Sequence, residues 1–219
     1  MYDFDFALVA EGKTDHAVLK NILLGYCKAR QQPREPRITR SHPDEESEFG
    51  GWPLTLSFLT DKCYIDALQL SENLIVHVDS DALQNEGLIA SPMLPDGSID
   101  VLALVPSIHQ LLRQKIGDDD CRKYGDRFIF AIAVREIECW ILPLWAENLA
   151  DKTVGCTAAL NNTVSKKGEK YFKTYRGYDE MSAKYRKKNF LLDEGPKNPS
   201  LKIFLEELDR RTITLPPDD

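Results

Sequence analysis

The sequence predicts an α/β fold with a mainly parallel sheet of about four strands flanked by helices. Three apolar runs of strand length occur at residues 4–10, 74–78 and 128–134. Continuous apolar runs of this kind are typical of strands that are buried on both faces of a parallel sheet. Segments with helical periodicity separate the runs, and this alternation favours parallel strands with right-handed crossovers.

The first run leads directly into a predicted helix. Thr14 is a suitable N-cap residue, and apolar residues recur at helical spacing from there to Lys28. Two prolines within residues 31–37 should end this helix, and residues 37–42 could form a short strand. The acidic stretch 41–53, rich in Gly and Pro, is expected to be a loop.

Later segments complete a core and an extension. Helical periodicity returns at residues 54–70, and a loop is expected at 85–98. Further helices are predicted, and they cover residues 107–117, 139–145 despite Pro143, and 200–210. We therefore expect a catalytic α/β core over residues 1–150. A basic, aromatic-rich helical extension over residues 151–219 should pack on that core, and the basic segment between the helices 139–145 and 200–210 is expected to be partly mobile.

The composition predicts a soluble cytoplasmic protein. The chain has 219 residues, 42% apolar and 29% charged, which is ordinary for a globular protein with one sizeable core. No apolar run approaches the roughly 18 residues that a membrane span needs. The N-terminus lacks the positive charge of a secretory signal. Five scattered cysteines without a CxxC pair indicate a reducing compartment and give no zinc motif.

Charge is unevenly distributed along the chain. The net charge of −7 argues against bulk attraction to nucleic acid, but residues 164–190 hold nine basic and three acidic side chains, or about +6. Six aromatic residues alternate with these cations, which suits phosphate pairing and base stacking. A solvated helix with an apolar underside would show the same pattern, because Tyr171, Tyr175 and Tyr178 have helical spacing.

Acidic residues follow each of the three predicted central strands. The pairs are, in chain order, Glu11 with Asp15, Asp79 with Asp81, and Glu136 with Glu138. Because the carboxyl ends of parallel strands meet at one edge of a sheet, we expect the pairs to converge. Crowded carboxylates repel one another unless a cation neutralises them, and hard oxygen ligands suit Mg²⁺ or Mn²⁺. The alternative is that these acidic residues are helix caps and turn residues. His77, inside the predicted strand beside Asp79, is expected to be structural or to support the carboxylates.

The segments VAEGKTD and HVDSD resemble the glutamate and DxD motifs of TOPRIM domains, a likeness that spans residues 4–142. The segment AVREIECWILP and the presence of Asp15 are more similar to small bacterial TOPRIM proteins related to the overcoming-lysogenization-defect nucleases. The resemblance implies that Glu11 is a general acid/base or a metal-associated group. It also implies that Asp79 and Asp81 hold Mg²⁺.

Two Mg²⁺ or Mn²⁺ ions are implied by the same resemblance. Glu11 and Asp15, with Asp79 or Asp81, would hold one ion, while Glu136 and Glu138 would complete the second. A lysine that balances charge in the transition state would be Lys166 or Lys167, by order along the chain. Contacts to nucleic acid are expected from further basic residues, namely Lys13, Arg135, Lys170, Lys173 and Arg176.

The predicted function is metal-dependent hydrolysis of phosphodiester bonds in DNA or RNA, with two metals activating water and stabilising the leaving oxygen. Small TOPRIM proteins of this kind resemble effectors of bacterial phage defence that work with an ATPase encoded nearby. The alternative is therefore a binding subunit that is non-catalytic or activated by such a partner. The chain has no active-site tyrosine signature and lacks the length for strand passage, which argues against a topoisomerase. An oligomer is possible on this interpretation.

Overall fold

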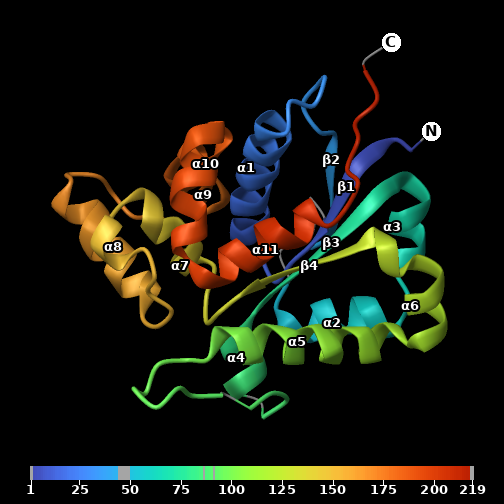
Figure 1. The fold of residues 1–219 in the computed structure, drawn as a ribbon, viewed down its shortest axis with the longest axis horizontal. Helices are drawn as coiled ribbons and strands as arrows, with labels where there is room; N and C mark the ends of the chain where they lie inside the picture. The colour runs from blue at the N-terminus through green and yellow to red at the C-terminus, as the bar shows by residue number, and fades with distance from the viewer. Residues whose placement is uncertain (1, 44–49, 86, 91, 218–219) are drawn as a thin grey trace.

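A computed structural model describes residues 2–43, 50–85, 87–90 and 92–217 (Figure 1). Four strands form a parallel sheet in the order β2-β1-β3-β4. Their bounds are β1 (Phe4–Val9), β2 (Ile38–His42), β3 (Ser71–Asp79) and β4 (Phe128–Ala133). The predicted α/β class with a parallel sheet of four strands is confirmed, and the sheet is consistent with a Rossmann-like arrangement.

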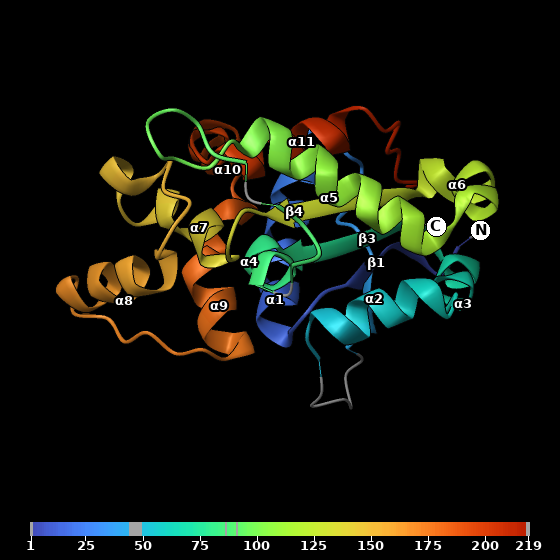
Figure 2. The same ribbon diagram turned by 90° about the horizontal axis from the view of Figure 1, so that it is seen from below.

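Helices cover both faces of this sheet. The connection from β1 to β2 runs through α1 (Lys13–Ala29), which packs on one face. The opposite face carries the helices of the next two connections, and these are α2 (Trp52–Thr60), α3 (Tyr64–Leu70), α4 (Ser80–Asn85), α5 (Val101–Ile116) and α6 (Asp118–Tyr124). Figures 1 and 2 show α1 and α5 on opposite sides of the strands.

The C-terminal segments pack against α1 and β4. Here α9 (Tyr175–Ser182), the 3₁₀ turn η4 (Ala183–Arg186) and α10 (Lys188–Glu194) lie against α1, while α11 (Pro199–Asp209) lies against β4. At the left in Figure 1, α8 (Cys156–Lys166) projects outward, while α7 (Glu138–Ile141) lies further in with all four of its residues buried. Within the expected helical extension, α8, α9 and α10 are helices whose buried residues include Leu160, Tyr178 and Leu191.

Alternate residues of the strands bury into two separate apolar clusters. In β1, Phe6 and Leu8 face the cluster beneath α1, whereas Ala7 and Val9 face the cluster beneath α5. Because side chains alternate along a strand, a continuous apolar run is what two covered faces require. This two-sided burial explains why the three central strands could be located from sequence.

Several element boundaries differ from expectation. The helix predicted at 54–70 is two helices, α2 and α3, separated by Lys62 with a φ of 60°. The predicted helix at 107–117 begins earlier, because the Asp100 side chain accepts a hydrogen bond from the Ala103 N–H and caps α5 despite Pro106. The first helix begins at Lys13 after an N-cap at Gly12, not after Thr14.

The expected helix at residues 139–145 was wrong only in part. Pro143 does limit the helix predicted at 139–145, since α7 ends at Ile141 and a 3₁₀ turn (Leu142–Leu144) follows. Parts of the predicted loops 41–53 and 85–98, namely residues 44–49, 86 and 91, lie outside the described residues. Over the part of the chain that the structure describes, none of the helices combines the length and apolar character that crossing a membrane requires.

Candidate carboxylate site at the switch point of the sheet

The chain leaves β1 and β3 toward opposite faces of the sheet. After β1 the chain enters α1, which packs on one face, and after β3 it enters α4, which leads to α5 on the other. Since β1 and β3 are neighbours, their carboxyl ends form the topological switch point of the sheet, where open α/β sheets usually bind ligands. Figures 1 and 2 place α4 and α7 at this same end of the sheet.

Glu11 connects the two strand ends. Its Oε1 accepts a hydrogen bond from the backbone N–H of Asp79 at 2.9 Å. Its own carbonyl accepts from the Gly51 N–H at 2.6 Å, and a Cβ at Gly50 would lie 2.1 Å from this carbonyl oxygen. Burial raises the pKa of Glu11 to about 7, and repulsion by Asp15 and Asp81 adds to the rise.

Asp15 lies buried in the first turn of α1. Its Oδ2 accepts a hydrogen bond from the Gly12 N–H at 2.9 Å, and its Oδ1 accepts from the Thr14 hydroxyl at 3.3 Å. This is the helix-capping role that the alternative interpretation of the acidic pairs assigns to Asp15. Burial nevertheless raises the pKa of Asp15 to about 7, and repulsion by Glu138 contributes. Asp15 is therefore both a cap and a member of the charged cluster.

His77 lies between two of the carboxylates. Its Nδ1 is 3.9 Å from Asp15 Oδ2, and its Nε2 is 3.6 Å from Asp79 Oδ1. His77 Nδ1, His77 Nε2 and Asp79 Oδ1 are all buried, and none of them has a hydrogen-bond partner among the described residues. Burial lowers the pKa of His77 to about 3, so the ring is neutral near pH 7.

Asp79 and Asp81 lie at the end of β3. Burial raises the pKa of Asp79 well above its ordinary value, and repulsion by Asp15 and Glu11 adds to it. Burial also raises the pKa of Asp81, with repulsion by Glu136 contributing and the positive charge of Arg135 opposing. The Asp81 N–H donates to the Arg135 carbonyl at 3.3 Å, which joins the ends of β3 and β4.

Glu136 and Glu138 reach the cluster but bind to neighbouring elements. Glu136 accepts from the Thr157 N–H and hydroxyl, both at 2.7 Å, and so caps α8. Glu138 is buried and accepts from the Tyr178 and Tyr171 hydroxyls, the latter at 3.3 Å. Both carboxylates are thus already satisfied by the protein.

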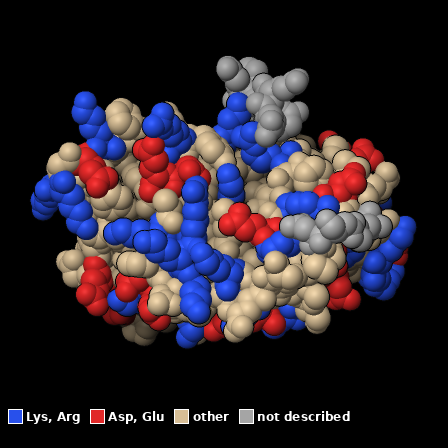
Figure 3. Space-filling model, turned by 90° about the horizontal axis from the view of Figure 1, so that it is seen from above, with Lys and Arg blue, Asp and Glu red and all other residues tan. Residues whose placement is uncertain are grey.

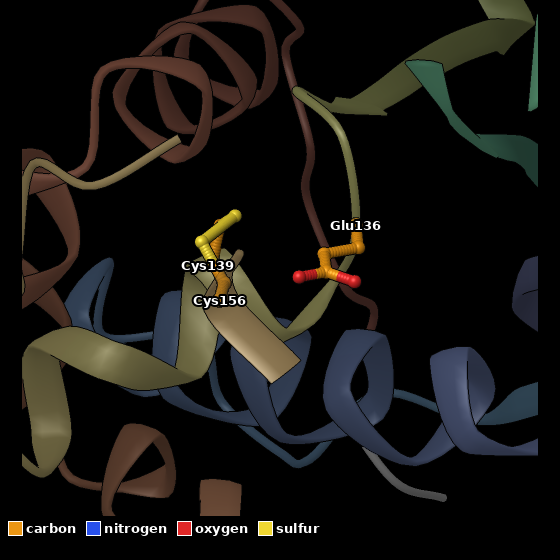
Figure 4. A group of neighbouring side chains, drawn as sticks. All are labelled: Glu136, Cys139 and Cys156. Carbon is orange, nitrogen blue, oxygen red and sulfur yellow. A yellow bond between two sulfur atoms is a disulfide. The ribbon is translucent and has the colours of Figure 1, made fainter. Parts of the chain in front are cut away.

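A disulfide joins Cys139 to Cys156 beside Glu136 (Figure 4). The scattered cysteines had indicated no such pair. The bond connects α7 to α8, and residues 17 apart in sequence meet because the chain turns back between these helices. Among the described residues, Glu136, Cys139 and Cys156 are the one group with three ligand-type atoms within 4.8 Å of one another. Since two of the three are in the disulfide, this group is not a metal site.

The donors at these strand ends are nevertheless of the kind that a hard divalent cation prefers. It offers carboxylate oxygens with raised pKa values, and Asp79 Oδ1 is buried without a partner. No three carboxylates among the described residues come within 4.8 Å of one another. Side-chain rotation or bridging water would therefore be needed to gather them around one ion.

The basic residues predicted to act here are distributed differently from expectation. Lys173 Nζ lies 3.8 Å from Glu138 Oε1, with its side chain 69% exposed. Lys167 donates to the Trp145 carbonyl at 2.7 Å, and for Lys166 no ion pair is found within the described part of the chain. Arg135 adjoins Asp81. Of the remaining candidates, Arg176 is paired with Glu180, Lys13 lies at the start of α1, and Lys170 is exposed.

Sequence reasoning missed the tyrosines that hold Glu138. Tyr171 and Tyr178 are seven residues apart, which is two helical turns, but Tyr171 precedes α9 and the two rings still meet with hydroxyls 2.6 Å apart. No protein-family model matches the chain, and its comparison with curated proteins and with solved structures gave no match either. The fold and the site thus define an α/β protein with a carboxylate-rich site at the switch point of its sheet.

Proposed function

We propose that this protein is a divalent-metal-dependent phosphodiesterase of the TOPRIM type that hydrolyses DNA or RNA. The observation that carries the proposal is the convergence of Glu11, Asp15, Asp79 and Asp81 at the switch point, with the pKa of each raised by burial and by repulsion from nearby carboxylates, which include Glu136 and Glu138. Such a concentration of negative charge is unfavourable in the empty protein and is relieved by a bound cation. Clusters of this kind are more common at functional sites than elsewhere.

The side chains have separable roles in this proposal. Asp79 and Asp81 would hold Mg²⁺ or Mn²⁺, and Glu11 would bind the same ion or move a proton while its Oε1 remains tied to Asp79. A bound ion would supply a water of lowered pKa and a charge opposite the phosphate. Lys173, exposed beside Glu138, would pair with a phosphate oxygen of the substrate.

Whether Glu136 and Glu138 complete a second ion site depends on rearrangement. Glu136 would have to release Thr157, and Glu138 would have to release two tyrosine hydroxyls. This specific observation favours the second candidate, a subunit that becomes active only with a partner such as an ATPase encoded nearby, as in phage defence. The partner would shift the 171–178 segment or α8 and thereby free these carboxylates.

Cleavage assays test the first candidate. Purified protein, alone and with its neighbouring gene product, is incubated with single- and double-stranded DNA and RNA in the presence of Mg²⁺, Mn²⁺ or EDTA. Metal-dependent cleavage that Asp79→Asn abolishes is expected. Cleavage confined to the mixture with the partner supports the second candidate, and absence of cleavage under every condition overturns both as catalysts.

A further inference from the structure

A cavity of about 460 Å³ lies beside α1, and none of the carboxylates described above lines it. It is formed where α1, β2, α9 and η4 meet, and its lining includes three cationic side chains and one acid, Glu35. The cations are Lys20, Arg40 and Arg186, and of these Arg186 is already paired with Asp179 at 2.5 Å. Figure 3 shows that Lys and Arg side chains also gather near the centre of the face seen from above in Figure 1. No ion pair of Lys20 is found within the described part of the chain, so its ammonium is the charge that the lining offers to an anion.

The lining also contains a buried acceptor. His16 is 1% exposed, and its Nε2 lies 2.9 Å from the His42 carbonyl oxygen. A carbonyl only accepts, so Nε2 carries the proton and Nδ1 of the neutral ring presents a lone pair. Nδ1 has no partner among the described residues. A ligand group that donates a hydrogen bond, such as a sugar hydroxyl or a base amine, would satisfy it.

An aromatic and apolar wall completes the cavity. Tyr175 contributes its ring, over which the Arg40 guanidinium lies at 5.4 Å from the centroid, and Leu24 and Ile38 add apolar surface. Planar rings stack well on tyrosine and on arginine planes. A ligand with a planar ring, a hydrogen-bond donor and a phosphate matches all three parts of the lining.

We propose that this cavity is a binding site for a nucleoside monophosphate, with the base against Tyr175, a donor group of the nucleoside on His16 and the phosphate near Lys20. The same chemistry is offered by a free nucleotide and by the terminal nucleotide of a strand. The 171–178 segment borders both sites, since Lys173 approaches Glu138 and Tyr175 lines the cavity. The inference does not depend on the carboxylates being catalytic.

Calorimetric titration of the full chain in EDTA tests this proposal, because chelation removes any contribution of a metal at the carboxylate site. Nucleoside 5′-monophosphates are compared with adenosine, ribose 5-phosphate, inorganic phosphate and a 5′-phosphorylated tetranucleotide. The monophosphates should bind at least about tenfold more tightly than ribose 5-phosphate or adenosine. Tighter binding of the tetranucleotide would identify a strand end as the source, and equal or weaker binding would identify the free nucleotide.

Variants locate the binding to the cavity. Tyr175→Leu and Lys20→Ala should each weaken it about tenfold, since stacking on one aromatic ring is worth that much. Lys28→Ala, in the last turn of the same helix, is the matched control and should leave affinity unchanged. The Glu11→Gln protein should also bind the monophosphates normally, which separates this cavity from the carboxylate site. Failure of all monophosphates to bind, equal affinity for inorganic phosphate, or unchanged affinity in both cavity variants overturns the proposal.

Discussion

Glu11 Oε1 accepts a hydrogen bond from the Asp79 N–H at 2.9 Å, so the first carboxylate after β1 is fixed to the end of β3. We predict that Glu11→Gln abolishes metal-dependent cleavage without unfolding the protein. The amide oxygen of Gln can still accept this hydrogen bond, whereas the negative charge that a metal requires is lost. Activity should fall at least about 100-fold, since even outer partners of metal ligands cost 10- to 100-fold.

Initial rates and thermal melting of the same samples check this prediction. Glu206→Gln, on the exposed side of α11, is the matched control and should keep full activity. A Glu11→Gln protein that melts normally and cleaves at the wild-type rate would remove Glu11 from the metal site. It would leave the structural link to Asp79 as its role.

The raised pKa of Asp15 predicts a pH-dependent difference between wild type and Asp15→Asn. Burial raises this pKa from 3.8 to about 7, so the folded protein holds the proton more tightly than the unfolded chain. The contribution to stability is complete below about pH 4 and is lost as the pH rises to about 7. Asp15→Asn keeps an acceptor for Gly12 but has no charge, and should therefore gain stability relative to wild type across this window.

Chemical denaturation of both proteins at a series of pH values measures this difference. The comparison is necessary because burial lowers the pKa values of His16 and His77 to about 3, and their titration destabilises the fold as the pH falls. Added Mg²⁺ should stabilise wild type more at about pH 8 than at about pH 5, since protonated carboxylates bind metal weakly. A stability difference that does not change with pH would contradict the raised pKa of Asp15.

The sheet and two of the carboxylate pairs could be predicted because local signals specify them. Strands buried on both faces are continuous apolar runs, and residues after parallel strands must meet at one edge. Residues 4–10, 74–78 and 128–134 satisfy the first condition, and Glu11 and Asp79 the second. Boundaries such as the split between α2 and α3 depended on single residues, here the left-handed Lys62, that periodicity does not reveal.

The surroundings of Glu136 and Glu138 could not be predicted because distant segments supply them. Thr157 and Tyr178 lie 21 and 40 residues further along the chain from the carboxylates that they bind. Chain order alone had favoured Lys166 or Lys167 as the charge-balancing lysine, whereas packing of the segment before α9 brings Lys173 to Glu138. Tertiary contacts of this range leave no periodic or local signal in one sequence.

Lys173 is predicted to matter more for cleavage than Lys166 or Lys167. Its Nζ is 3.8 Å from Glu138, while Lys167 is bonded to the Trp145 carbonyl. Lys173→Met should reduce the rate about 10- to 100-fold with little change in stability, because an exposed ion pair contributes at most about 1 kcal/mol. Lys167→Met and Lys166→Met should retain at least about half of the wild-type rate.

Single-turnover rates for the three methionine variants decide this order. Lys170→Met, an exposed neighbour in the same segment, serves as the control for loss of one positive charge. A larger loss in Lys167→Met or Lys166→Met than in Lys173→Met would favour the lysine implied by the TOPRIM resemblance. It would also require the 166–173 segment to move on binding substrate.

The Cys139–Cys156 disulfide should contribute to stability and hold α8 beside Glu136. It closes a loop with a sequence separation of 17, for which cross-linking lowers the entropy of the unfolded chain and stabilises by about 3 kcal/mol. Reduction, or the double substitution of both cysteines by Ser, should lower the midpoint of unfolding accordingly. The link from Glu136 to Thr157 at the start of α8 should loosen at the same time.

Thiol counting by alkylation and mass spectrometry tests the bond directly. Denatured but unreduced protein should label at Cys27, Cys63 and Cys121 only, and reduced protein at all five cysteines. Cys63→Ser, at an exposed free thiol, is the matched control and should leave both the unfolding midpoint and the protection of Cys139 unchanged. Labelling of Cys139 and Cys156 before reduction would show that the two thiols are close but unjoined, as expected in a reducing compartment.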